Sequence, residues 1–414
     1  MSVSDPAIAA TRMQASANVA PYTNMPENGA RTISILNTWS SLQGVSQRWR
    51  EWQQNPNADI EFVKFIMEIR PECEHPYVMC VQHGNETEAL LIGRLEHPRV
   101  SIRVGYLQVA QPELRVISFL YGGLLGTLNQ ESSDALVRAI VDRIAHRDAD
   151  AAFFSHVRQG SPLALSLQSI PGIFRRDTVS TVQPHRSLRI PQSVDAFYAG
   201  LSTKVRKNQK WQAKKLLESF AQRVEVRCYT KVGDLGTLFR DVDQIASTTY
   251  QRGLGVGFAD TPEMRGRMQL AARKGWLQAF VLYLADKPGA FWIGTRYRNC
   301  FFSDFMGYDA TNAKYSPGMY LVVKGIEHFC EESESERIAE IDFGLGDAQY
   351  KQVLGTDAWL EESSYIYSLN LRGAVLNLSR TITGVVDKGA RGFLRKLNLE
   401  AAIKTGWRKR VAQR

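Results

Sequence analysis

Polar and ionisable side chains gather between Cys300 and Lys351 at spacings suited to binding an anionic ligand. The pattern predicts a strand over Cys300–Tyr308, a polar loop over Asp309–Pro317, a helix beginning at Gly318 and a short strand over Ile338–Phe343. A strand that leads through a tight loop into a helix presents unpaired N–H groups and the positive end of the helix dipole. We therefore expect the functional centre of the chain here. The residues that can do chemistry at it are Asp304, Tyr308, Lys314, Tyr315, Ser316, Asp342, Asp347, Tyr350 and Lys351.

The bulk composition describes a large globular chain whose net charge is concentrated at one end. With 414 residues, 44% of them hydrophobic, the chain can bury the cores of two or three domains. Its 51 Lys and Arg exceed its 42 Asp and Glu by nine, and the segment Leu371–Arg414 alone holds 11 basic and 2 acidic residues. The rest of the chain is therefore close to neutral, and a surface for duplex nucleic acid is not expected.

Cysteine usage and hydropathy point to a cytoplasmic protein. The five cysteines show no CxxC spacing, which disfavours a disulfide framework and a zinc site, so no metal is expected. The start of the chain lacks a basic segment followed by a continuous apolar one, which disfavours a signal peptide. The longest apolar run, Val116–Leu125, is too short to span a bilayer.

The order of predicted elements indicates an α/β (α+β) fold that contains a structural duplication. Strands, a glycine loop, a helix and a strand occur at about 77–156 and again at about 277–343. Tryptophans at helical spacings predict a helical segment over Ser34–Gln53, broken near Gly44. We divide the chain into a disordered leader (1–29), two α/β units (30–190 and 191–370), each a mixed central sheet flanked by helices, and a basic helical tail (371–414).

A strongly basic helix is predicted over Thr203–Phe220. Arg206, Lys210 and Lys214 follow one another at intervals of four residues and share one face of it. Such a face is either a solvated charged surface or a surface that meets phosphates or an acidic substrate.

Five short motifs in order resemble the GNAT-superfamily acetyltransferase domain of the cellulose-biosynthesis (CelD-like) type, related to the FemAB aminoacyl transferases. They are Leu201–Asn208, Tyr250–Gly253, Gly307–Asp309, Tyr315–Gly318, and Asp342–Asp347 with Tyr350 and Lys351. The resemblance implies two GNAT-like α/β units packed together, which fits the duplication. It also implies an acyltransferase that transfers groups other than aminoacyl groups, with acetyl-CoA as co-substrate.

The resemblance further implies roles for residues of the central stretch. Tyr308 or Tyr350 would protonate the leaving thiolate, and Asp342 or Asp347 would accept the proton of the attacking amine. Structural roles are the alternative: each aspartate can end a strand or cap a turn, and each tyrosine can be a core aromatic.

The same resemblance assigns binding residues. Gly318 would let a pyrophosphate approach backbone N–H groups beside Tyr315 and Ser316. Lys314 and Lys351 would supply the positive charges that balance the phosphates. The loop departs from the usual GNAT pattern, because Pro317 has no backbone N–H to donate. The residues expected to face an acidic acceptor are Lys204, Arg206, Lys207 and Asp304.

We expect the acceptor to be the amine, or a hydroxyl, of a cell-envelope or exopolysaccharide precursor. One alternative is a FemAB-like transferase that takes its aminoacyl group from tRNA, and another is a catalytically inactive scaffold for polysaccharide assembly. The tail combines an apolar stripe with basic residues around it. It either docks on the protein's own core or lies on the anionic inner face of the cell membrane.

Overall fold

The computed structural model describes residues 31–99, 102–104, 107–247 and 257–396. The predicted leader, the Tyr250–Gly253 motif and the chain beyond Lys396 lie outside these residues.

One mixed sheet of twelve strands runs through the whole molecule, in the order β1-β2-β3-β6-β7-β14-β8-β13-β12-β11-β10-β9. The strands of its N-terminal half are β1 (Arg31–Leu36), β2 (Cys73–His83), β3 (Glu86–Glu96), β6 (Val116–Gly126) and β7 (Ala151–Arg158). The remaining strands are β8 (Thr181–Arg189), β9 (Val224–Tyr229), β10 (Leu277–Leu284), β11 (Lys287–Tyr297), β12 (Cys300–Tyr308), β13 (Glu340–Leu345) and β14 (Asp357–Tyr367). A separate two-stranded sheet holds β4 (Ile102–Val104) and β5 (Leu107–Ala110).

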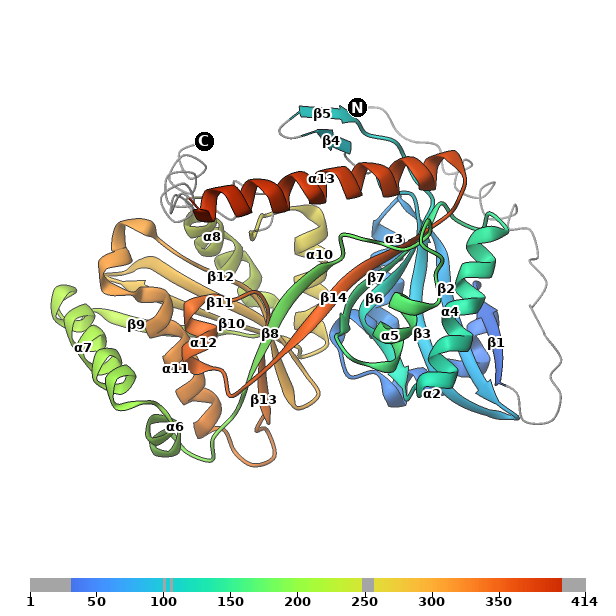
Figure 1. Ribbon diagram of the computed structural model, residues 1–414. Coiled ribbons are helices and arrows are strands. Elements are labelled where there is room, and N and C mark those ends of the chain that lie inside the picture. The colour runs from blue at the N-terminus through green and yellow to red at the C-terminus, as the bar shows by residue number, and fades with distance from the viewer. Residues whose placement is uncertain (1–30, 100–101, 105–106, 248–256, 397–414) are drawn as a thin grey trace, which may run out of the picture.

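Helices cover both faces of each half of the sheet. The N-terminal half carries η2 (Ser41–Val45), α2 (Ser46–Trp52), η3 (Pro56–Ala58), α3 (Ile60–Ile69), α4 (Gln130–Ala145) and α5 (Pro162–Ser169). The other half carries α6 (Val194–Gly200), α7 (Thr203–Ser219), η4 (Val232–Asp234), α8 (Leu235–Ala246), α10 (Pro262–Arg273), η5 (Ala310–Tyr315), α11 (Pro317–Glu331) and α12 (Gln349–Leu354). Helix α13 (Leu371–Lys396) follows the last strand and lies across the top of both halves in Figure 1.

Alternation of side chains along the strands builds a core on each face. In β2, Met79 packs with α4 and α5, whereas Val78 points to the opposite face and packs with α2 and α3. In β10, Phe280 packs under α11, and its neighbour Val281 packs under α8 and α10. The predicted α/β class is confirmed, and the two predicted units share one mixed sheet flanked by helices.

Two strands cross over between the halves and join them into one sheet. Strand β14, from the end of the chain, pairs on one side with β7 and on the other with β8, and β8 in turn pairs with β13. Figure 1 shows β8 in green and β14 in orange running side by side between the halves. The centre of the sheet is therefore built from segments that are distant in sequence.

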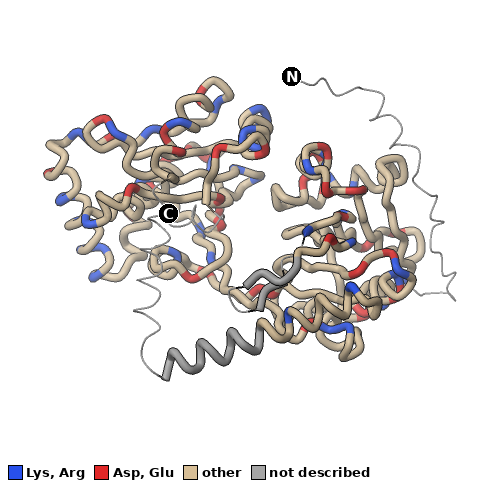
Figure 2. Tube along the Cα trace, turned by 90° about the horizontal axis from the view of Figure 1, so that it is seen from above, with Lys and Arg blue, Asp and Glu red and all other residues tan. Residues whose placement is uncertain are grey.

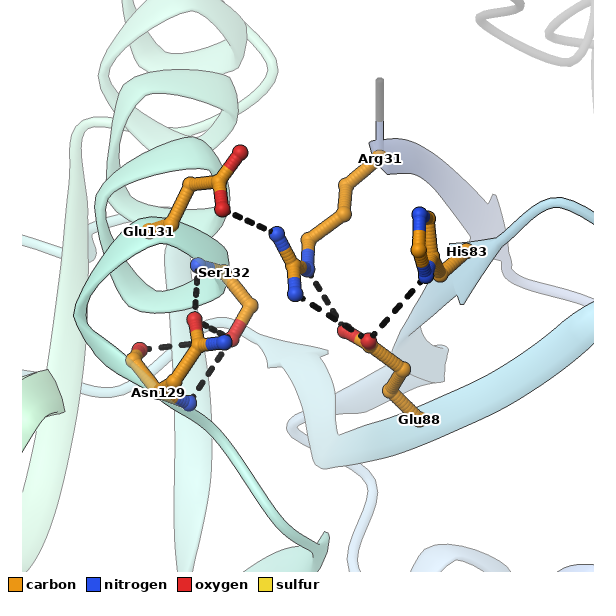
Figure 3. Close-up of polar contacts among 6 residues, drawn as sticks. All are labelled: Arg31, His83, Glu88, Asn129, Glu131 and Ser132. Carbon is orange, nitrogen blue, oxygen red and sulfur yellow. Dashed lines mark hydrogen bonds and ion pairs between the residues drawn. The ribbon is translucent and has the colours of Figure 1, made fainter. Parts of the chain in front are cut away.

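Polar contacts fix the first strand to the N-terminal half (Figure 3). The Arg31 guanidinium donates to Glu88 on β3 (Nε to Oε2, 2.7 Å) and also pairs with Glu131 on α4. Helix α4 begins in a capping box, in which the Asn129 side chain accepts from the Ser132 N–H. The prediction of a helical segment over Ser34–Gln53, broken near Gly44, is wrong at its start, because Ser34 pairs with Cys80 of β2 and the helical turns begin only at Ser41.

Within the part of the chain that the structure describes, no helix combines the length and apolar character needed to cross a bilayer.

Helix α11 packs so closely against the sheet at Gly325 that a substitution there tests the packing. A Cβ added at Gly325 would lie 2.6 Å from Cζ3 of the buried Trp292, whereas nothing lies within 4 Å of a Cβ added at Gly236 in α8. We expect Gly325→Ala to lower the free energy of unfolding by about 1–3 kcal/mol through overpacking. The matched change Gly236→Ala is expected to be neutral, or stabilising by up to about 1 kcal/mol. Chemical denaturation measures both, and equal shifts would contradict the packing described.

Candidate active site

An opening in the centre of the C-terminal half begins where β12 and β13 separate. The two strands pair in parallel only through Cys300–Phe302 and Glu340–Asp342, although β12 continues to Tyr308 and β13 to Leu345. Strand β13 stays paired with β8 on its other side. It therefore separates from β12 but remains part of the sheet. Backbone groups of the segment 303–308 that face β13 are therefore available to an extended ligand, since buried N–H and C=O groups require partners.

A bulge in β12 places a carboxylate at this opening. Ile293 of β11 pairs with Phe305 and Gly294 pairs with Ser303, which leaves Asp304 between them without a partner in the register. Because the bulge adds one residue, Asp304 and Phe305 both point toward the face covered by α10. Asp304 lines a small cavity there.

The surroundings of Asp304 raise its affinity for a proton. Its Oδ2 accepts from Thr295 Oγ1 at 2.6 Å, and the residue, which lines the small cavity, is exposed to solvent. Loss of hydration in this recess raises the pKa of Asp304 to about 6, although the hydrogen bond from Thr295 and the charge of Arg267 act in the opposite direction. A carboxylate with such a pKa is suited to proton transfer near neutral pH.

A tyrosine occupies the opposite face of the same opening. Tyr350 on α12 packs edge-on against Phe343 of β13, with ring centroids 5.7 Å apart, in the core beneath α11. Burial raises its pKa above the ordinary value, and hydrogen bonding with Ser303 opposes this. Tyr350 is therefore protonated at neutral pH and can act as a donor.

The predicted base Asp342 belongs to a buried ion-pair network. His185 of β8 is fully buried, with its Nε2 2.6 Å from Asp342 Oδ1 and its Nδ1 3.2 Å from Glu361 Oε2 on β14. Its ring stacks on Trp359 at 4.3 Å between centroids. Burial alone lowers the pKa of His185, but contacts with the two carboxylates outweigh it and raise the pKa to about 9. Asp342 Oδ1 also accepts from the Gly344 N–H at 2.6 Å, so this oxygen is already engaged.

Other predicted residues lie apart from the opening or are occupied. Asp347 is exposed and accepts from Arg186 (Nε to Oδ1, 3.0 Å), and hydrogen bonding from Gln352 and Arg186 lowers its pKa. Lys351 is buried and donates from Nζ to the Leu345 carbonyl at 2.6 Å; burial lowers its pKa to about 8. These contacts argue against a proton-accepting role for Asp347 and against a phosphate counter-charge role for Lys351.

The predicted loop does lead into the start of α11. Ser316 takes a left-handed conformation (φ 53°), and Gly318 is buried where an added Cβ would lie 3.1 Å from Cδ1 of Tyr308. The exposed Lys314 carries its Nζ 4.9 Å from the Tyr315 ring centroid. Tyr308 thus packs against the helix start, and 44% of it is exposed.

A basic cavity of about 480 Å³ lies between α7 and α11, beside Ser316. Lys210 and Lys214 of α7 and Lys324 of α11 line it, together with the buried Gln209. Figure 2 shows the Lys and Arg positions of α7 following one another at the left edge of the molecule. Lys204, Arg206 and Lys207, the residues predicted to face the acceptor, belong to the same helix but do not line this cavity.

A cleft of about 330 Å³ between the two halves reaches the opening from the other face. Tyr121 and His156 line it from the N-terminal half, and Leu345 lines it from β13. Arg267 of α10 lines both this cleft and the small cavity around Asp304, so the two adjoin. The cations Arg70 and Arg94 in the cleft are paired with Glu263 and Glu96. Arg267 has a cation–π contact with Phe62, at 5.6 Å, and its charge acts on the carboxylates of Asp304 and Glu263.

Sequence comparison assigns the segment that carries this site. Residues 203–352 match the model of the acetyltransferase (GNAT) domain, which confirms the resemblance predicted from the motifs. Among curated proteins, none matches the sequence.

Solved structures of low sequence identity are similar to the chain. FemX is 12% identical, with a TM-score of 0.49 over 80% of this chain and 96% of that one. A tandem GNAT protein from the clavulanic acid biosynthesis pathway is 8% identical, with a TM-score of 0.46 over 81% and 98%. A conserved protein of unknown function from Bacteroides thetaiotaomicron VPI-5482 is 11% identical, with a TM-score of 0.46 over 80% and 97%.

The His185 network predicts a stability difference that depends on pH. His185→Gln leaves two buried carboxylates without their cation and should cost about 3–5 kcal/mol of unfolding free energy near pH 6. Because the folded-state pKa of about 9 exceeds the ordinary 6.5, this stabilisation is complete below pH 6.5 and is lost as pH rises through about 9. Urea unfolding of both proteins from pH 6 to 10 should show the difference shrink.

The matched control is His146→Gln, at an exposed histidine of the N-terminal half. It should change stability by no more than about 0.5 kcal/mol at any of these pH values. A wild-type-to-His185→Gln difference that stays constant across the range would contradict a charged His185.

Proposed function

Residues 203–352 match the acetyltransferase (GNAT) domain, and from this premise we propose that the chain transfers an acetyl group from acetyl-CoA to the amine of an anionic cell-envelope or exopolysaccharide precursor. The observation that carries the proposal is the opening between β12 and β13, with Asp304 on one face and Tyr350 on the other. Acyl transfer from a thioester to an amine needs a base on the acceptor side and a proton donor on the sulfur side.

The donor fits the opening and the basic cavity together. The pantetheine arm of CoA contains two amides, which can pair with the free edge of β12 over residues 303–308 as an added strand would. The diphosphate and the 3′-phosphate need cations and N–H donors, which the start of α11 and Lys210 supply. The other two lysines of the cavity, Lys214 and Lys324, are paired with Glu218 and Glu327. The cavity beside Ser316 therefore suits the phosphate end of the donor.

We assign the role of general base to Asp304. With a pKa of about 6 it is mostly ionised at neutral pH, yet it is more basic than an ordinary aspartate. An acceptor amine in the adjoining cleft would lose its proton to this carboxylate, directly or through water, as its nitrogen forms the new bond to the acetyl carbon.

We assign the role of general acid to Tyr350. The C–S bond of the thioester breaks as the C–N bond forms, and the sulfur takes up a proton from the phenol. Its place beneath α11, across the sheet from Asp304, keeps the two proton transfers on separate sides of the reacting carbon.

The cations of the cleft support the proposal of a negatively charged acceptor. Of these, Arg70 and Arg94 are neutralised by carboxylates, which leaves Arg267 to meet a phosphate or carboxylate of the acceptor beside Asp304. A phosphate-bearing amino sugar, such as a sugar nucleotide, has both groups that this arrangement requires.

Substitution at the base tests the assignment. We expect Asp304→Asn to reduce kcat by about 10²–10⁴-fold, the range associated with general-base catalysis, with little change in KM for acetyl-CoA. The wild-type kcat/KM should fall below about pH 6, with the pKa of Asp304, and the variant should lack this dependence. Thiol release from acetyl-CoA with a panel of amine-bearing sugar nucleotides measures both.

The matched control is Asp347→Asn, at the exposed aspartate paired with Arg186, which should retain at least about half the activity. Loss of activity in this variant and not in Asp304→Asn would move the base to Asp347. Wild-type protein that reacts with aminoacyl-tRNA and not with acetyl-CoA, or with neither, would contradict the proposed donor.

Charge reversal in the basic cavity tests the donor site. Lys210→Glu should weaken acetyl-CoA binding by about tenfold or more, because a phosphate would meet a carboxylate in place of an ammonium group. Lys207→Glu makes the same change on the same helix outside the cavity and should have an effect of about threefold or less. Calorimetric titration compares them, and equal effects would show that only the overall charge of α7 matters.

A further inference from the structure

Helix α13 presents a row of apolar side chains to solvent. Leu371, Val375, Leu378 and Ile382 are 80%, 42%, 62% and 46% exposed. Their spacings of four, three and four residues place them within an arc of about 60° on a helix that turns about 100° per residue. We call this row, together with Ile173 and Phe174, the apolar face.

The opposite side of α13 attaches the helix to the protein. Leu376 is buried with Val116, Ala151 and Tyr367, and Arg380 donates to Asp177 at 3.2 Å. Among the described residues, the exposed side chains Leu371, Val375, Leu378 and Ile382 therefore lie on the side of α13 away from these attachments.

Ile173 and Phe174 extend this surface beyond the helix. They lie between α5 and β8, are 73% and 78% exposed, and are joined to α13 where Asn377 Nδ2 donates to the Phe174 carbonyl at 3.0 Å. Figure 1 shows α13 across the top of both halves, with β4 and β5 above one part of it. Contiguous exposed apolar side chains of this kind mark interaction sites.

The charge of the same segment identifies the occupant. Residues 371–414 hold 11 Lys and Arg against 2 Asp and Glu, which accounts for the whole excess of nine positive charges in the chain. An apolar face combined with a concentration of cations is the arrangement that binds the interface of an anionic bilayer.

We propose that the apolar face inserts into the surface of a membrane that contains anionic lipids, to which the net positive charge of the segment 371–414 attracts the protein. The attachment is peripheral, and it is independent of the acyl transfer proposed above. It would hold the protein against the bilayer along α13.

Vesicle flotation of the full-length protein tests this. Wild-type protein should bind vesicles of phosphatidylcholine with phosphatidylglycerol, should not bind phosphatidylcholine alone, and should bind less as salt is raised. Leu378→Glu should reduce binding by about tenfold, because an exposed leucine that enters the bilayer is lost. The matched control Val232→Glu alters a valine of η4 that is 43% exposed and should bind as the wild type does.

Both substitutions are at exposed positions, so an unchanged unfolding midpoint confirms that each variant folds. Three results would overturn the proposal. They are absence of wild-type binding, binding of Leu378→Glu equal to that of wild type, and a wild-type dimer in solution that Leu378→Glu converts to a monomer. The last would assign the apolar face to a second copy of the chain.

Discussion

The ion pairs of His185 with Asp342 and Glu361 hold together the three strands on which the site depends. They link β8, β13 and β14 in the middle of the sheet, and Asp342 is also the last residue of β13 that pairs with β12. Beyond this point β13 follows β8 and leaves β12. A buried imidazolium between two carboxylates therefore lies where the opening begins, and it fixes the strand whose departure creates the opening.

The opening separates the two proton transfers that the proposed reaction requires. Because of the bulge opposite Gly294, Asp304 lines the small cavity that adjoins the inter-half cleft, while Tyr350 lies beneath α11 on the other side of the sheet. Neither residue depends on a flexible segment for its position, since one is on a strand and the other on a helix that packs against β13. Rigid elements thus set the distance between acid and base, and the free edge of β12 is left for the donor between them.

Local features of the site could be predicted from the sequence, and long-range ones could not. The strand over Cys300–Tyr308 and the helix after Pro317 follow from alternation and from the turn residues between them. The bulge at Asp304 depends on the register with β11, and the partner of Asp342 is 157 residues away in β8. For the same reason the sequence around Ser34 predicts a helix, although pairing with β2 makes it a strand. His185 and Arg267 belong to no local sequence pattern that would predict their roles.

Amide hydrogen exchange with and without acetyl-CoA tests the central claim most directly, namely that the donor occupies the free edge of β12. The account predicts that saturating acetyl-CoA slows exchange in the segment 303–308 and at the start of α11, and leaves β2 and β3 unchanged. A saturated complex in which the segment 303–308 exchanges as fast as in the free protein would contradict it. So would protection confined to the N-terminal half.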